Sequence, residues 1–100
     1  MCTYITEKVP AEGSGKGAAG WFALQTTTVY FDHPQHAAAD HTLNIDFANP
    51  ALGPAARVAV ELSAQSARAL ADAIHSILDQ TPQQLKDPGA DFLTAATDPA

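Results

Sequence analysis

Residues 41–47, His41-Thr42-Leu43-Asn44-Ile45-Asp46-Phe47, alternate apolar and polar side chains. Successive side chains of a β-strand point to opposite faces, so this alternation predicts a strand with one apolar and one polar face. His41 shares the apolar face with Leu43, Ile45 and Phe47, while Asp46 points the other way. The chain is therefore expected to build a sheet with one face to bury.

Three other stretches have the character of strands. Residues 2–9 are rich in β-branched and aromatic side chains and end at Pro10, and residues 21–31 include three consecutive threonines. Residues 57–62 alternate, with three apolar side chains on one face. Together with residues 41–47, these stretches predict four strands.

One helix is predicted directly after the last strand. Ser63 is a suitable N-cap, and residues 64–78 repeat apolar side chains at helical spacing. These apolar side chains are Ala67, Leu70, Ala71, Ile74, Ile77 and Leu78. The opposite stripe carries Arg68, Asp72, His75 and Asp79, and we expect His75 to be a surface residue beside one of these aspartates.

The order of these elements predicts an α+β fold: a four-stranded antiparallel sheet with one C-terminal amphipathic helix packed on one face. We expect a single domain over residues 1–79. Residues 80–100 contain three prolines and few large apolar groups, which predicts a mobile, disordered tail. The second sheet face stays open and only 16% of residues are charged, so a homodimer is expected.

Charge and composition limit the partners. Five lysines and arginines face eleven carboxylates, for a formal net charge of −6, which argues against nucleic acid and anionic membranes as partners. No apolar run approaches a membrane span, and no signal-peptide pattern opens the chain. The single Cys2 cannot form an internal disulfide. A cytoplasmic protein is expected.

The segment from Asp32 to His41 holds three of the four histidines. It lies between two predicted strands, and a loop of this length can bring its side chains together. Imidazole and carboxylate groups are ligands for zinc, iron(II), nickel or copper. We therefore predict a divalent transition metal site formed by His33, His36 and His41, with Asp32 or Asp40. Strand parity argues against Asp46 as a ligand beside His41.

Other interpretations of these residues stay open. The segment can be a polar hairpin loop whose aspartates accept turn hydrogen bonds, or a metal-free acid-base site using His33 and His36. If Met1 is removed, Cys2 presents a thiol beside a free amine and becomes a second catalytic candidate; the alternative is a small buried residue.

Trp21 and Tyr30 are candidates to line a pocket near the histidines, although core or interface positions are the ordinary roles of such side chains. Residues 13–17 superficially resemble a phosphate-binding loop. Their spacing does not match the pattern and a strand follows, so we expect an ordinary flexible loop.

Several segments carry a resemblance to a known family: residues 1–5 and 7–9, the glycine-rich loop at 13–17, Asp32-His33-Pro34 with His36 and His41, and residues 43–47. Over residues 1–79 the chain resembles a family of short, uncharacterised bacterial proteins that form a domain of unknown function. The resemblance implies one self-contained unit and brings no activity, fold or ligand.

These observations predict a small metal-binding protein that uses a histidine cluster in a strand-loop-strand segment. A metal-dependent enzyme acting on a small metabolite is the catalytic form of this hypothesis. The alternatives are a non-enzymatic module that binds a small molecule or a protein, and an oligomeric accessory protein without a ligand.

Overall fold

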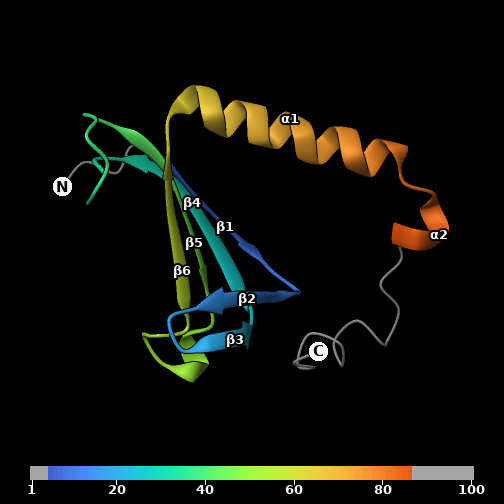
Figure 1. The fold of residues 1–100 in the computed structure, drawn as a ribbon, viewed down its shortest axis with the longest axis horizontal. Coiled ribbons are helices and arrows are strands. Elements are labelled where there is room, and N and C mark those ends of the chain that lie inside the picture. Colours follow the sequence, from blue (N-terminus) through green and yellow to red (C-terminus); the bar gives the residue numbers. More distant parts are fainter. Residues whose placement is uncertain (1–4, 87–100) are drawn as a thin grey trace.

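The computed structural model describes residues 5–86 and has the predicted α+β fold (Figure 1). Its strands are β1 (Ile5–Pro10), β2 (Ser14–Gly17), β3 (Gly20–Ala23), β4 (Thr26–Asp32), β5 (Thr42–Ala48) and β6 (Arg57–Leu62). Its helices are the 3-10 helix η1 (Pro50–Leu52) and the α-helices α1 (Ala64–Gln80) and α2 (Gln83–Lys86).

The main sheet is antiparallel and has the strand order β1-β4-β5-β6. Its register places Val29 opposite Ile45 and Ile45 opposite Val60, so the apolar side chains of neighbouring strands share one face. This apolar face consists of Val29, Phe31, Leu43, Ile45, Phe47, Val58, Val60 and Leu62. The polar face consists of Tyr30, Asp32, Thr42, Asn44, Asp46, Ala59 and Glu61.

A small second sheet corrects two sequence expectations. Residues 21–31 do not form one long strand, and residues 13–17 are not only a loop, because β2 and β3 pair as a separate hairpin. The chain changes sheets at Leu24 and Gln25, whose N–H groups donate to Gly13 and Ala48. Gly20, the first residue of β3 after the hairpin turn, has φ +116°, a backbone conformation that favours glycine.

Helix α1 begins where the sequence predicts. The Ser63 hydroxyl accepts the Ser66 N–H at 3.1 Å and caps the helix. The helix ends at Gln80, and α2 lies inside the stretch predicted to be a tail. The rest of that tail, residues 87–100, lies outside the described residues. Within residues 5–86, no helix is long and apolar enough to span a membrane.

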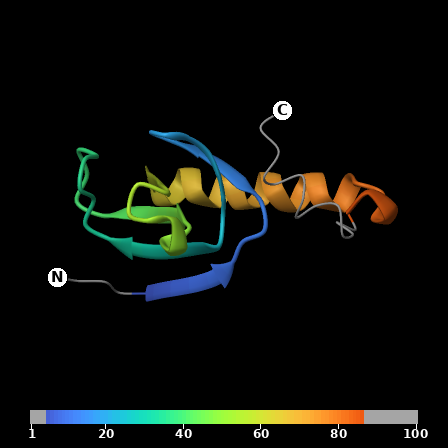
Figure 2. The same ribbon diagram turned by 90° about the horizontal axis from the view of Figure 1, so that it is seen from below.

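The position of α1 differs from the expectation that it packs across the sheet. Figures 1 and 2 show α1 leaving the end of β6 and extending past the sheet. Only Ser63 separates β6 from α1, so the chain turns directly at the sheet end, and none of the α1 residues is buried. The helix contacts β5 and β6 but leaves the apolar face of the sheet incompletely covered.

In the described part of this chain, most of the buried residues are polar, whereas an ordinary small domain buries mainly apolar ones. Among residues 5–86, the buried side chains are the polar Asp32, Thr42 and Asn44 and only one hydrophobic residue, Ala56. The eight residues of the apolar face are all partly exposed. Large aliphatic and aromatic side chains are normally the buried ones, so the described chain lacks a closed hydrophobic core.

Candidate functional site

The loop of residues 33–41 joins β4 to β5 and is held by a carboxylate from β6. The Glu61 carboxylate accepts backbone N–H groups from Gln35 at 2.6 Å, from Ala37 at 2.9 Å and from His36 at 3.2 Å. Strand parity places Glu61 opposite Asn44 on the polar face, facing the loop. The loop is therefore tied to the sheet by a residue about 25 positions away.

These contacts change the acidity of Glu61. The N–H groups of Gln35 and Ala37 stabilise the charged carboxylate and lower the pKa of Glu61 below its ordinary value of 4.5, with a further contribution from His36. A carboxylate that accepts several backbone N–H bonds favours its ionised form. Sequence reasoning missed Glu61, and only the alternation of residues 57–62, which places it on the polar face, could have pointed to it.

Three residues at the ends of this loop form a group that could hold a metal ion. One ligand atom from each of His33, Asp40 and His41 lies within 4.8 Å of those of the other two. The His33 and His41 rings lie 4.4 Å apart at their centroids, and His41 Nδ1 is 3.8 Å from an Asp40 carboxylate oxygen. In a tetrahedral zinc site, ligand atoms are about 3.4 Å apart, so small side-chain rotations would close the group.

The orientation of the His33 ring is set by the loop itself. Its Nδ1 lies 2.9 Å from the backbone carbonyl oxygen of Asp40, which can only accept a hydrogen bond. His33 Nδ1 therefore carries the proton, and Nε2 is the nitrogen whose lone pair is available. Metal-binding histidines commonly donate their second ring N–H to a carbonyl or carboxylate in this way.

His41 lies where strand parity predicts. Its ring stacks on Phe31 of the apolar face, with centroids 5.9 Å apart and ring planes 7° from parallel. Asp46 lies on the opposite face and forms an ion pair with Arg57 at 2.9 Å. Asp46 is accordingly outside the group formed by His33, Asp40 and His41.

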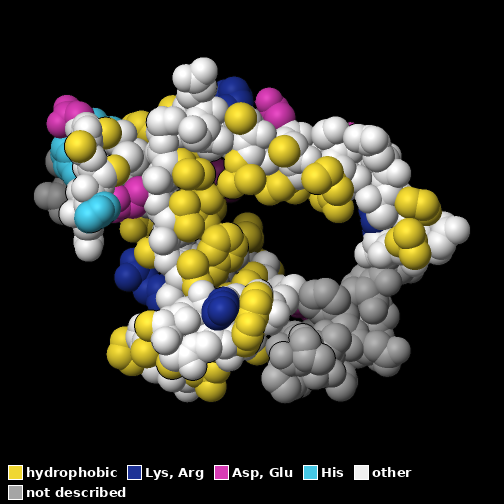
Figure 3. Space-filling view, in the orientation of Figure 1, with side chains coloured by type: hydrophobic (Ala, Val, Ile, Leu, Met, Phe, Trp, Pro, Cys, Tyr) yellow, Lys and Arg dark blue, Asp and Glu magenta, His cyan; other side chains and the backbone are white. Residues whose placement is uncertain are grey.

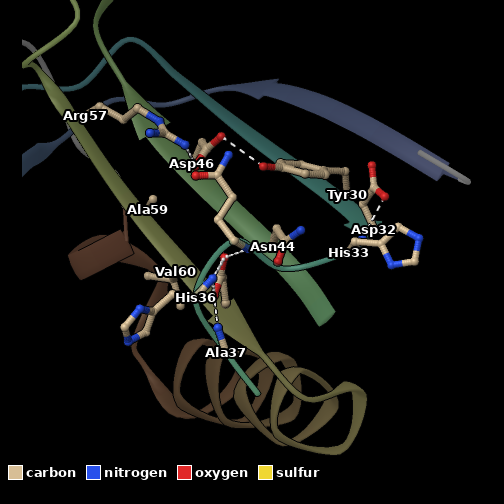
Figure 4. A pocket seen from close by; sticks show the side chains of 12 residues that line it. Tyr30, Asp32, His33, His36, Ala37, Asn44, Asp46, Arg57, Ala59 and Val60 are labelled. Carbon is tan, nitrogen blue, oxygen red and sulfur yellow. Dashed lines mark hydrogen bonds and ion pairs between the residues drawn. The ribbon is translucent and has the colours of Figure 1, made fainter. Parts of the chain in front are cut away.

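The structure does not bring the other candidates into this group. The Asp32 carboxylate is buried and accepts the His33 backbone N–H at 2.7 Å, and His36 donates its backbone N–H to Glu61. Figure 4 shows the His33 and His36 rings at opposite sides of the view. His75 is exposed on α1, as expected, and Cys2 lies outside the described residues.

A depression of about 800 Å³ lies on the polar face beside the loop (Figure 4). Tyr30, Asp46 and Arg57 contribute to its lining, and the Tyr30 hydroxyl donates to Asp46 at 3.5 Å. Burial, followed by the nearby Asp46 charge, raises the pKa of Tyr30 above 10.0. Tyr30 thus lines this depression, whereas Trp21 is exposed on β3 and is not among the lining residues.

The sequence matches the model of a known protein family. The model of the "Family of unknown function (DUF6295)" matches residues 1–87. The chain belongs to this family. The match confirms the resemblance seen in the sequence and extends eight residues beyond the predicted range of 1–79. No curated protein and no solved structure matches the chain.

Proposed function

We propose that this protein binds a divalent transition metal through His33, Asp40 and His41. The observation that carries the proposal is the convergence of two imidazoles and one carboxylate within 4.8 Å. The loop that presents them is clamped by Glu61, and the His33 tautomer is set by the Asp40 carbonyl oxygen. A preformed loop and an oriented imidazole both lower the cost of assembling a metal site.

The donor set narrows the choice of metal. Two histidines and one carboxylate suit zinc, iron(II), nickel or copper better than calcium or magnesium, which prefer oxygen ligands. Three protein ligands also leave a coordination position open. A metal bound there would supply Lewis-acid or bound-water chemistry, which would support a reaction on a small oxygenated metabolite.

Metal analysis of tag-free protein, purified without chelators, tests the proposal. We expect close to one equivalent of a transition metal, or uptake of zinc, nickel, copper or iron(II) added under anaerobic conditions. His33→Ala and His41→Ala should each abolish stoichiometric binding, and Asp40→Ala should weaken it. Each variant removes one of the three proposed ligands, so each should lower the metal occupancy.

Two histidines serve as matched controls. His75→Ala removes an imidazole from α1, far along the chain from the loop, and should leave occupancy unchanged. His36→Ala removes a loop imidazole that lies outside the group and should also leave it unchanged. Occupancy below about a tenth of an equivalent, with no uptake on titration, would refute metal binding.

A second function is favoured by the depression on the polar face. Its volume of about 800 Å³ is within the usual range for small-molecule sites, and Asp46, Arg57 and Tyr30 line it with charge and hydrogen-bonding groups. A non-enzymatic module that binds a small polar molecule would use this surface. A thermal-shift screen of polar metabolites tests it: a hit should be lost in Ala59→Trp, which fills the depression, and retained in His41→Ala, because His41 does not line the depression.

A further inference from the structure

Two apolar surfaces of this chain are incompletely covered in the described structure. One is the apolar face of the main sheet, whose eight residues are all partly exposed. The other is a stripe along α1, where Leu70, Ile74, Ile77 and Leu78 are between 44% and 65% exposed. Exposed apolar surfaces of this extent on a soluble chain mark an interaction site.

The two surfaces border one hollow. Figure 3 shows hydrophobic side chains along the side of α1 that faces the sheet and on the sheet itself, with an open space between them. A shallow groove of about 500 Å³ also lies on this part of the sheet, between Ile5 and Val9 of β1 and Phe31 and Leu43 of β4 and β5. The radius of gyration is 15.1 Å, above the roughly 12 to 13 Å of a compact chain of this size.

We propose that a second copy of this chain fills the hollow, with α1 of each protomer packed against the apolar sheet face of the other. An amphipathic helix is the natural cover for such a face, and each chain has one that does not cover its own sheet. With a twofold axis, α1 of each protomer covers the apolar sheet face of its partner, so both sheet faces are covered at once.

The area that the helix and sheet contacts would bury reaches the lower limit for a specific interface. The 17-residue α1 is about 25 Å long and about 10 Å wide, so packing it on a sheet removes about 500 Å² from water, counting both surfaces. Two such contacts related by symmetry remove about 1,000 Å², the lower bound for a specific interface. Contact between the two helices in the shared hollow adds to this area.

The remainder of the chain is a poorer occupant. Residues 87–100 contain only Phe92 and Leu93 as large apolar residues, against four exposed on α1 and eight on the sheet face. These fourteen residues also include two prolines and one glycine, which oppose a covering helix. Helix α1, by contrast, presents four exposed large apolar side chains on one stripe.

Sedimentation equilibrium of the full chain tests the proposal. We expect twice the 10.4 kDa chain mass for the wild-type protein. Ile74→Asp places a carboxylate in the centre of the apolar stripe and should give a monomer at the same concentration. Ala69→Asp makes a similar change on the opposite side of the same helix, where Ala69 is exposed, and should remain a dimer.

Three outcomes would overturn the proposal: a wild-type monomer, a different oligomer, or a dimer that persists in Ile74→Asp. If Ile74→Asp does not fold, hydrogen exchange of the wild-type protein tests the dimer instead. The amides of α1 should be strongly protected, and dilution below the dissociation range should reduce their protection. Protection of α1 that is independent of concentration would show that the cover comes from the same chain.

Discussion

The Glu61 carboxylate accepts the backbone N–H of Gln35 at 2.6 Å, although 26 positions separate the two residues. This contact connects the last strand of the sheet to the loop that carries the histidines. Ala37 and His36 donate to the same carboxylate, so one side chain organises the middle of the loop. The metal-ligand candidates His33 and His41 lie at the two ends of the segment that it holds.

Replacing Glu61 should loosen the loop. Glu61→Gln keeps an acceptor oxygen and removes the charge that strengthens the bonds to Gln35 and Ala37. Amide hydrogen exchange should speed up at Gln35 and Ala37, and metal affinity should fall. Glu12→Gln, a change at another exposed carboxylate, is the control and should alter neither. Equal amide exchange rates at Gln35 and Ala37 in the two variants would contradict the role of Glu61 in holding the loop.

The contact between Glu61 and the loop also predicts that the stability of the loop depends on pH. The pKa of Glu61 is lowered in the folded protein, so its contribution to loop stability is fully present above the ordinary value of 4.5. That contribution is lost as the pH falls through the lowered pKa, because the protonated group no longer holds the N–H groups as strongly. The amide shifts of Gln35 and Ala37, followed by NMR during acidification, should change together. If the same shift changes appeared in Glu61→Gln, they would not come from protonation of Glu61.

Tyr30 should ionise above 10.0. Its pKa is raised first by burial and then by the Asp46 carboxylate, and the Arg57 charge opposes this only in part. The folded state therefore holds the phenolic proton more tightly, so this contribution to stability is lost as the pH rises above the ordinary pKa. Ultraviolet titration of tyrosinate should show Asp46→Asn lowering the pKa of Tyr30. Tyr30→Phe identifies the signal, and no change in Asp46→Asn would contradict the assigned role of Asp46.

Gly20 should be sensitive to substitution. Its φ of +116° at the start of β3 is a conformation that residues with a Cβ rarely adopt, although no atom within 4 Å would meet the added methyl group. Gly20→Ala should therefore reduce the free energy of unfolding by about 1–3 kcal/mol through backbone strain alone. Chemical denaturation measures this loss. The neighbouring Ala19→Gly is the control, and an equal or larger loss there would contradict the strain argument.

Local patterns in the sequence determined the strands β5 and β6, the capped helix and the position of the histidine loop. Alternation in residues 41–47 and 57–62 and helical spacing after Ser63 depend on neighbouring residues, which act in the same way in any fold. Parity also placed His41 on the apolar side and Asp46 on the other, as the structure has them. These features needed no knowledge of distant contacts.

Only the tertiary structure decided the remaining features. The pairing of His33 with Asp40 and His41, without His36, depends on how the loop closes, and that closure is held by Glu61 from another strand. The separate β2–β3 hairpin depends on the change of sheets at Gln25, whose N–H donates to Ala48. The direction of α1 depends on the turn at Ser63. Each is a long-range or geometric relationship, and residue spacing along a chain does not encode which distant groups meet.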